Sequence, residues 1–270
     1  MACLTRAHAQ SHVGRVRSRN EDAFLLLPDR ELYVVADGMG GHQRGDVAAN
    51  VCIDAVRDWF TGQVGDDLMN RLLGAVRNWF GLKGAGGETD LVASVEFANR
   101  VIFDMASSSS AFRGMGTTVV SALFHGSTLF VVFSGDSRIY RLREGHLKQL
   151  SHDHSLLNEY LRLDMITPAE ARHFPHRNVI MKALGLKDRA ELEFFRRRTK
   201  PGDVYLLCSD GLTDMVEDDD IEAILLAEGS NEARAKKLVD AALEAGGHDN
   251  ITVLLVDYLG KVETGDPATT

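Results

Sequence analysis

Short apolar runs separated by polar and glycine-rich turns occupy several parts of the chain, and they predict strands. Valine, isoleucine, leucine and aromatic residues dominate these runs, as is typical of strands. Glu144-Gly145 predicts a hairpin turn between two of them. The predicted strands lie at 4–13, 21–36, Thr117–Phe124, Thr128–Phe133, Arg138–Leu142, Leu192–Arg197, Val204–Cys208 and 251–258.

Segments with apolar residues at helical spacing lie between these groups of strands. In Asp46–Phe60 the apolar positions fall on one face of a helix. Thr167-Pro168-Ala169-Glu170 is a capping box with proline at the first helical position, which predicts a helix start. Gly81–Asp90 is rich in glycine and predicts a flexible loop between two helices. The remaining predicted helices lie at Asp66–Phe80, Asp90–Ser107, 218–228 and 231–245.

Strands and helices come in blocks rather than in strict alternation, and this order bears on the fold class. Blocks of strands favour an α+β fold with antiparallel sheets flanked by helix pairs over a doubly wound parallel sheet. We expect one domain over 1–260, because no linker or repeat divides the chain. A mixed polar stretch at 152–190 predicts a subdomain over the surface of this domain, and 261–270 is expected to be a disordered tail.

Three of the predicted strands end in an aspartate beside a glycine, and a fourth aspartate stands directly before a strand. Each Asp-Gly pair alone is typical of a tight hairpin turn. The repeated pattern instead favours carboxylates that converge on one cleft, where cations would be needed to offset their repulsion. Such oxygen ligands suit Mg²⁺ or Mn²⁺. The runs and their aspartates are Leu32–Ala36 with Asp37, Leu129–Phe133 with Asp136, Val204–Cys208 with Asp210, and Asp249 before Ile251–Val256.

Composition narrows the class of protein. A formal net charge of −9 argues against a non-specific nucleic-acid binder, so we expect no nucleic-acid partner. Cys3, Cys52 and Cys208 are scattered, which predicts neither a disulfide framework nor a zinc site and favours a reducing compartment. The first residues lack the apolar core of a signal peptide, and no apolar stretch approaches the ~18 residues that span a bilayer. We therefore expect a cytoplasmic protein without membrane insertion.

Arginines and glycines lie next to two of the acidic positions. Arg15, Arg17 and Arg19 would share one face of a strand just before Glu21 and Asp22. A solvated surface is the simpler interpretation for Arg15 and Arg19, whereas a guanidinium beside a carboxylate–metal site can bind two phosphate oxygens.

The segment from Asp37 to His42 is glycine-rich but does not match a nucleotide-binding loop. Its glycines would allow the backbone to approach a metal and a substrate closely. His42 is either a ligand or proton donor, or a loop histidine hydrogen-bonded to the surrounding structure.

Seven motifs occur in a fixed order and together identify a family. They run from about residue 8 to 258, nearly the whole chain. In this order and composition the chain resembles the metal-dependent protein phosphatase family, the protein phosphatase 2C type, in its bacterial form. The motifs are Arg17-x-x-Asn20-Glu21-Asp22, Val35-Ala36-Asp37-Gly38-Met39-Gly40-Gly41-His42, Gly114-Met115-Gly116-Thr117-Thr118, Ser134-Gly135-Asp136-Ser137-Arg138, Asp153-His154-Ser155, Ser209-Asp210-Gly211-Leu212-Thr213-Asp214 and Gly247-His248-Asp249-Asn250-Ile251-Thr252.

The resemblance implies a central sandwich of two antiparallel sheets with helices on each side, and it implies a set of metal ligands. Asp37 would bridge two metals. Asp210 and Asp249 would complete the first metal site, and Glu21 with the Gly38 carbonyl would serve the second, largely through water.

A third, weaker metal site of the bacterial members is also implied, formed by Asp136 with Asp210 and Asp214. Arg17 matches the phosphate-binding arginine of the family. Asp22 matches an acid that orients water or a neighbouring ligand.

The implied reaction is attack on phosphorus by a water that two divalent ions acidify, with Arg17 and the metals stabilising the phosphoryl oxygens. Met39 stands where some eukaryotic relatives have a histidine thought to protonate the leaving group, so a metal-bound water or His42 would have to supply that proton. Met181-Lys182 stands where bacterial relatives often have Thr-Arg, which concerns the flap. The resemblance places this flap at about 156–185 and implies that it selects substrates. A solvated loop is nearly as good an interpretation for each of its basic and histidine residues, Arg162, Arg172, His173, His176 and Arg177.

We expect a monomeric phosphatase that uses Mn²⁺ or Mg²⁺ and removes phosphate from phosphoserine or phosphothreonine in proteins. Its partners would be a Ser/Thr kinase and that kinase's targets. Two alternatives remain: an inactive scaffold that binds phosphoproteins, and an enzyme acting on other phosphoesters. Retention of Asp37, Asp210, Asp249 and Arg17 disfavours the first, and the lack of a nucleotide loop or an aromatic cluster disfavours the second.

Overall fold

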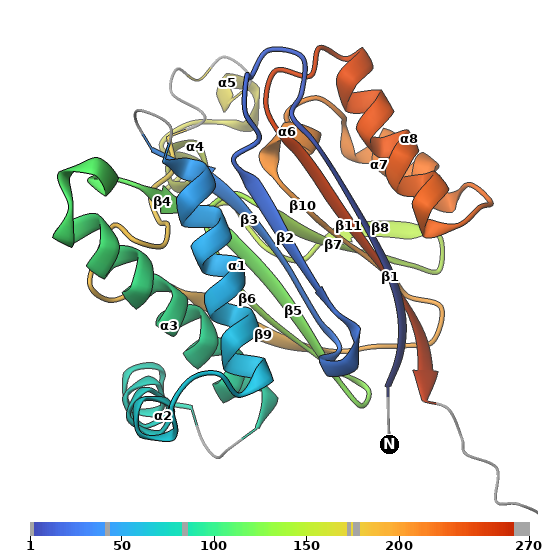
Figure 1. The fold of residues 1–270 in the computed structure, drawn as a ribbon. Helices are drawn as coiled ribbons and strands as arrows, with labels where there is room; N and C mark the ends of the chain where they lie inside the picture. The colour runs from blue at the N-terminus through green and yellow to red at the C-terminus, as the bar shows by residue number, and fades with distance from the viewer. Residues whose placement is uncertain (1–2, 41–43, 83–85, 172–173, 175–178, 262–270) are drawn as a thin grey trace, which may run out of the picture.

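Two antiparallel sheets form the centre of the molecule in the computed structural model, which describes residues 3–40, 44–82, 86–171, 174 and 179–261. The first sheet has the strand order β1-β11-β10-β7-β8, and the second has the order β2-β3-β5-β6-β9 with β4 paired to β3 (Figure 1). The strands of the first sheet are β1 (Cys3–His12), β7 (Arg138–Arg143), β8 (His146–Gln149), β10 (Val204–Cys208) and β11 (Ile251–Lys261). The strands of the second are β2 (Asp22–Leu27), β3 (Leu32–Met39), β4 (Gly116–Thr117), β5 (Val119–His125), β6 (Thr128–Ser134) and β9 (Glu193–Arg198).

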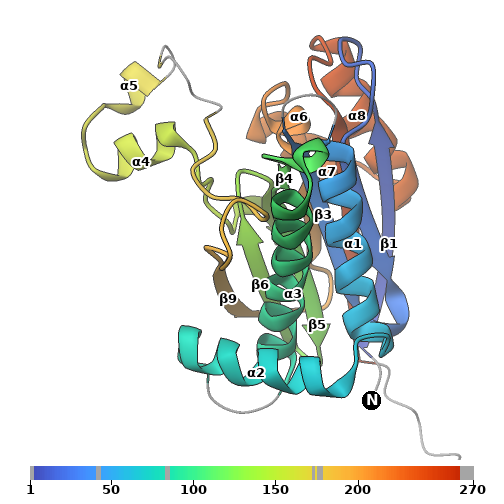
Figure 2. The ribbon, with the colours of Figure 1, turned by 60° about the vertical axis from the view of Figure 1, so that its left-hand side comes forward.

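Helices cover the outer face of each sheet, so the molecule has four layers. Figures 1 and 2 show α1 and α3 on the second sheet, with α2 across the lower end of α3, and α7 and α8 on the first sheet. Two short helices, α4 and α5, stand away from the sheets (Figure 2). The helices are α1 (Gly45–Thr61), α2 (Asp66–Phe80), α3 (Gly87–Ser108), α4 (Leu156–Arg162), α5 (Pro168–Ala171), α6 (Asp210–Thr213), α7 (Asp218–Leu226) and α8 (Asn231–Glu244), with 3-10 turns at Pro28–Arg30 and Ser110–Phe112.

The side-chain alternation of the strands produces three apolar layers. In β3, Tyr33 and Val35 pack between the two sheets, whereas Val34 and Ala36 pack under the helices α1 and α3. The same division occurs in β10 of the other sheet. Strands with both faces buried read as continuous apolar runs, which is the pattern seen in the sequence. The predicted fold class, two antiparallel sheets flanked by helices, is confirmed.

Local boundaries differ from the sequence predictions at a few places. The strand predicted at 21–36 is interrupted by the 3-10 turn at Pro28–Arg30, because proline cannot donate a ladder hydrogen bond. Helix α3 begins at Gly87, inside the loop predicted at Gly81–Asp90. The strand β11 continues to Lys261, and 262–270 lie outside the described residues, so the predicted tail is not tested there.

Among the described residues no helix is both long enough and apolar enough to cross a membrane.

Candidate active site

The strand ends gather the predicted aspartates at the end of the sandwich where α6 and the first turn of α1 lie, in the upper part of Figure 1. Asp22 begins β2 and lies opposite Asp37 of β3 in the antiparallel register. Asp136 lies between β6 and β7, Asp210 follows β10, and Asp249 precedes β11. We call Asp22, Asp37, Asp136, Asp210 and Asp249 the aspartate cluster.

Electrostatics shows that the members of the aspartate cluster lie near one another. Burial raises the pKa of Asp37 well above its usual value, and the charges of Asp22, Asp210, Asp136 and Asp249 raise it further. Burial likewise raises the pKa of Asp210, together with the charge of Asp136. Several carboxylates so close together disfavour one another's ionised form, so the cluster attracts protons or cations.

The main chain of Asp37 is held by hydrogen bonds to two threonines, Thr117 and Thr118, in the segment where β4 leads into β5. Its N–H donates to Thr118 Oγ1 at 3.1 Å, and its carbonyl accepts from the Thr118 N–H at 2.8 Å and from Thr117 Oγ1 at 2.9 Å. Thr118 Oγ1 also lies 2.7 Å from Ser137 Oγ, next to Asp136. Through these hydrogen bonds, Thr117 and Thr118 hold the backbone at Asp37 and the residue next to Asp136, two of the predicted metal ligands.

Gly38 lets three chain segments meet at the predicted second metal site. A Cβ on Gly38 would lie 2.1 Å from the Gly45 carbonyl oxygen and 2.6 Å from the Glu21 carbonyl oxygen. The Gly38 N–H donates to that Glu21 carbonyl at 3.1 Å. The pKa of Glu21 is raised by burial and by the charge of Asp46. The glycine is therefore required by close packing against the backbone of Gly45 and Glu21. The predicted approach of this backbone to a metal and a substrate stays a prediction.

Asn250 connects Glu21 to the chain around Arg17. Its Oδ1 accepts from the Glu21 N–H at 2.7 Å, and its Nδ2 donates to the Val13 carbonyl at 2.9 Å and to the Arg19 carbonyl at 2.8 Å. Asn250 belongs to the last of the seven motifs, but the motif alone predicts no role for it. Its place directly after Asp249 was the only available signal.

The side chain of Asp22 is buried, and only one of its two carboxylate oxygens has a hydrogen-bond donor. Its Oδ2 accepts from Ser209 Oγ at 2.8 Å, while its Oδ1 is buried without a hydrogen-bond partner. Ser209 Oγ in turn accepts from the Thr252 N–H at 3.0 Å. Burial raises the pKa of Asp22 to about 6, and the charge of Asp249 adds to this shift.

Asp136, Asp210 and Asp214 line a cavity of 270 Å³ that also contacts α4. Oδ1 of Asp136 and Oδ1 of Asp210 are buried without a hydrogen-bond partner. Burial raises the pKa of Asp136 to about 6, with a further contribution from the charge of Asp153. Asp153 itself is bound by the guanidinium of Arg138 at 2.9 and 2.7 Å.

Arg17 lies at the exposed edge of the aspartate cluster. Its Nη2 donates to Asp249 Oδ2 at 2.7 Å, and 54% of its side chain is exposed. This hydrogen bond raises the pKa of Arg17. Arg15 and Arg19 are also exposed, as predicted for a solvated surface. Only Arg17 among these three makes a side-chain bond to the aspartate cluster in the described structure.

The residues present fit divalent cations. Asp22, Asp136 and Asp210 each keep a buried carboxylate oxygen without a donor, which costs free energy unless a cation or water binds there. The side-chain ligand atoms of the aspartate cluster are carboxylate oxygens, the type preferred by Mg²⁺ and Mn²⁺. His42, the predicted alternative proton donor, lies outside the described residues.

Comparisons with known proteins agree with this geometry. The model of the family described as protein phosphatase 2C matches residues 10–245. The serine/threonine phosphatase stp of Listeria welshimeri is 36% identical over 247 residues, which cover 90% of this chain and 92% of that protein.

Two solved structures are similar over nearly the whole chain. The serine/threonine phosphatase PstP/Ppp of Mycobacterium tuberculosis is 36% identical with a TM-score of 0.81, covering 95% of this chain and 99% of that one. The catalytic domain of PstP in complex with two manganese ions is 35% identical with a TM-score of 0.75, covering 94% and 97%. Sequence, fold and the oxygen-lined cluster agree, and the chain belongs to the protein phosphatase 2C family of metal-dependent phosphoprotein phosphatases.

Proposed function

We propose that this protein hydrolyses phosphoserine and phosphothreonine in proteins at a centre of two Mn²⁺ or Mg²⁺ ions, with a third, weaker ion beside them. The observation that carries the proposal is the set of buried carboxylate oxygens without donors at the strand ends of a phosphatase fold. The relatives named above, which are serine/threonine phosphatases, support the choice of substrate class.

The aspartate cluster and its neighbours would hold the ions. Asp37 would bridge the two main ions, and Asp210 and Asp249 would complete the first site. Glu21 and the Gly38 carbonyl would serve the second. The third ion would lie in the 270 Å³ cavity, held by Asp136, Asp210 and Asp214.

When bound, the ions supply an acidified water and positive charge for the phosphoryl oxygens. Arg17 binds the phosphate with its guanidinium, for which its exposed place beside Asp249 is suited. Asp22, held by Ser209, orients water or a neighbouring ligand at the buried side of the site. Met39 has no proton to give, so the leaving alkoxide takes its proton from water or from His42.

The described cysteines are not nucleophiles in this scheme. Cys52 and Cys208 are buried, and burial raises the pKa of each thiol to about 12. A thiol that stays protonated at neutral pH attacks phosphorus poorly. This favours water as the attacking group.

We further propose that residues 1–260 act as one phosphatase domain and that the flap at 156–185 selects among phosphoproteins. The protein would act as a monomer and oppose a Ser/Thr kinase. The 270 Å³ cavity supports a role for the flap, because α4 lines it beside Asp136 and Asp210.

The test is hydrolysis of a phosphothreonine peptide and of an aryl phosphate, each with Mn²⁺, with Mg²⁺ and with chelator. We expect metal-dependent phosphate release that is lost in Asp210→Asn. Release from the aryl phosphate and small metabolites but not from peptides would favour an enzyme of other phosphoesters. A folded protein that releases nothing, yet binds phosphopeptides, would be a scaffold, and the proposal would be wrong.

A further inference from the structure

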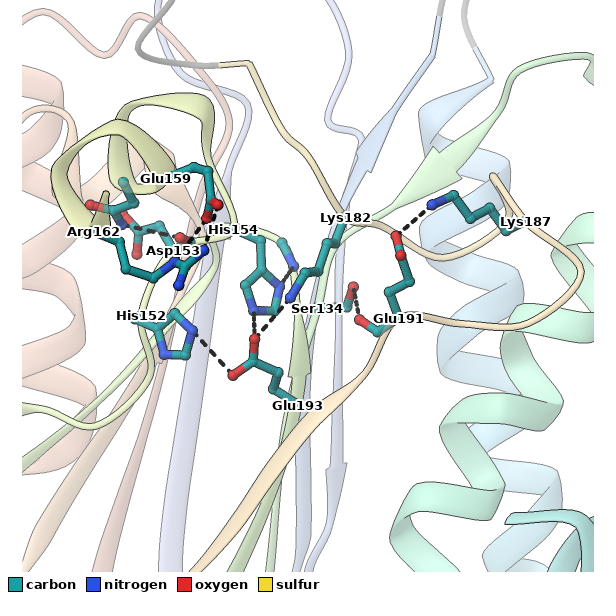
Figure 3. Close-up of polar contacts among 12 residues, drawn as sticks. Ser134, His152, Asp153, His154, Glu159, Arg162, Lys182, Lys187, Glu191 and Glu193 are labelled. Atoms are coloured by element: carbon teal, nitrogen blue, oxygen red, sulfur yellow. Dashed lines mark hydrogen bonds and ion pairs between the residues drawn. The ribbon is translucent and has the colours of Figure 1, made fainter. Parts of the chain in front are cut away.

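A second cluster of titratable residues lines a cavity of 1080 Å³. Figure 3 shows the polar contacts of this cluster. The carboxylate of Glu193, at the start of β9, is hydrogen-bonded to Lys182 Nζ at 2.8 Å and to His154 Nε2 at 3.0 Å, and it lies 3.1 Å from His152 Nε2. We call these four residues the Glu193 cluster. Its two histidines and Glu193 offer three ligand atoms within 4.8 Å of one another.

This spacing would suit a metal ion, but the protonation of His154 opposes one. The Gly135 N–H donates to His154 Nδ1 at 3.1 Å, and an amide cannot accept in return. Burial and the charge of Lys182 lower the pKa of His154 to about 4, so the ring is neutral and its proton sits on Nε2. That proton is donated to Glu193, which leaves Nε2 without a lone pair for a metal.

His154 also fixes both sides of Gly135. Besides accepting the Gly135 N–H, it donates its own backbone N–H to the Gly135 carbonyl at 2.9 Å. Gly135 has φ of +110°, and a Cβ there would lie 2.6 Å from the Thr118 side chain, so only glycine fits this turn. The next residue is Asp136, whose carboxylate enters the 270 Å³ cavity.

His154 and Glu193 also connect two segments of the chain at the point where the flap meets the body. We call these segments, residues 152–156 and 179–182, the flap neck. The Met181 N–H donates to the His154 carbonyl at 2.7 Å, and Ser155 and Ile180 form an isolated β-bridge. Lys182 lies in the second of these segments and His154 in the first, and both bind the Glu193 carboxylate. Figure 3 shows both side chains directed at Glu193.

We propose that His154 and Glu193 are positioning residues of the active site: through Gly135 they fix the Asp136 carboxylate, and they hold the flap neck beside it. The inference rests on the proposed function, because it assigns Asp136 to the third ion. No step of the reaction occurs at either residue.

Packing is the competing role for His154, and it can be separated from hydrogen bonding. The ring is stacked on Phe133 with centroids 5.1 Å apart and an interplanar angle of 19°. His154→Phe keeps a ring for this stack but removes both nitrogens. His154→Asn loses the stack but places an acceptor oxygen where Nδ1 lies.

The first measurement is structural and needs no activity. In the full chain loaded with diamagnetic Mg²⁺, ¹⁵N NMR should show the neutral Nε2–H tautomer of His154 and a Gly135 amide protected from hydrogen exchange. His154→Phe should speed exchange of that amide by at least about tenfold, and His154→Asn should restore most of the protection. An Nδ1–H tautomer, or a Gly135 amide unprotected in the parent protein, would overturn the inference.

The second measurement is the Mn²⁺ dependence of phosphate release. His154→Phe should raise the Mn²⁺ concentration at half-maximal activity about tenfold, the usual size for residues that orient a ligand, and His154→Asn should rescue it. Glu193→Ala should act in the same direction and Glu193→Gln much less, because glutamine keeps an acceptor for Nε2–H. The matched control is His152→Phe, which removes a neighbouring exposed imidazole with no hydrogen bond to Gly135 and should stay within about twofold.

The last arm separates positioning from general destabilisation. In an Asp136→Asn background, His154→Phe should change the Mn²⁺ dependence no further, because the carboxylate that it positions is gone. Additive effects, or a larger defect in His154→Asn than in His154→Phe, would assign the residue to packing alone. If Asp37→Asn abolishes turnover while His154→Phe leaves the Mn²⁺ dependence unchanged, the positioning role fails and the proposed function stands. If Asp37→Asn stays active, the proposed function itself fails.

Discussion

The aspartate cluster and the Glu193 cluster meet at one turn, Gly135-Asp136, but their carboxylates have opposite surroundings. Asp136 and Asp210 each keep a buried oxygen without a donor. Glu193 has two hydrogen-bond donors, Lys182 and His154, and lies 3.1 Å from His152 Nε2. Although burial raises the pKa of Glu193, the hydrogen bond from Lys182 and the charges around it hold that pKa below its usual value. Spacing alone would choose the Glu193 cluster as the metal site, since within the described part of the chain it is the group whose three ligand atoms lie within 4.8 Å of one another. Unsatisfied acceptors, rather than short distances between ligands, distinguish the cluster that needs a cation.

The largest expected effect comes from removing a central carboxylate of the first cluster. Asp37→Asn should lower turnover by more than about 100-fold, above the usual range for residues that only orient ligands. The same change removes a repelled buried charge, so the chelator-treated variant should unfold at a higher temperature than the chelator-treated parent. Phosphate release and thermal unfolding, each with Mn²⁺ and with chelator, measure the two effects. Full activity in Asp37→Asn would show that the cluster has been misassigned.

The two clusters should also give opposite dependences of stability on pH. The pKa of Asp22 and of Asp136 is raised to about 6 in the folded protein. The stability from such carboxyls is present below their unfolded pKa and is lost as pH rises through about 6. The pKa of His154 is lowered to about 4, so its stability is present above its unfolded pKa and is lost as pH falls through that value.

The pKa values of Asp37 and Asp210 are raised as well. In the presence of chelator, the carboxyl groups with raised pKa values therefore outnumber the single imidazole, His154, whose pKa is lowered. The free energy of unfolding should therefore fall between about pH 4 and pH 7, with about 3 kcal/mol for each shift of two pKa units. Denaturant unfolding over this range measures it. Asp136→Asn should flatten the fall, His154→Phe should steepen it, and Mn²⁺ should reverse it by binding the ionised carboxylates. A flat profile in chelator would contradict the surroundings described for both clusters.

Arg17 has a smaller expected effect because it lies at the exposed edge of the aspartate cluster. In the proposed site, Arg17→Ala would remove a charge-assisted hydrogen bond to phosphate, so we expect KM to rise about tenfold or more, with a smaller change in kcat. Arg17→Lys should be intermediate, since it keeps the charge but not the fork. Steady-state kinetics on a phosphothreonine peptide measures both, with Arg15→Ala as the exposed control. A drop in kcat without a change in KM would place Arg17 in a different role.

The sequence predicted the fold class and the family because both follow from local patterns. Continuous apolar runs mark strands covered on two faces, and the aspartates at their ends are visible without a structure. The sequence also predicted metal dependence, because this property follows from the family. Which residues bind the ions stays a prediction. The anchoring roles of Asn250 and of Glu193 were missed, because each depends on a partner far away in the chain: Glu21 for the first and His154 for the second. Nothing in the composition of β9 distinguishes Glu193 from any surface glutamate.

Lys182 should give the smallest effect, and it refines the comparison most closely. The side chains of Lys182 and Glu193 are each about one-third exposed, at 33% and 36%, so solvent screens their pairing. Pairs of this kind contribute about 0–1 kcal/mol. Lys182→Met should thus lower the free energy of unfolding by less than about 1 kcal/mol and leave the Mn²⁺ dependence within about threefold, because His154 still donates to Glu193. Denaturant unfolding and a Mn²⁺ titration of phosphate release check the two values beside Lys187→Met, which removes the neighbouring pair with Glu191. A defect as large as that of His154→Phe would mean that the ammonium of Lys182, rather than the imidazole of His154, fixes Glu193. The contacts that lead to Asp136 would then begin in the segment 179–182 of the flap neck.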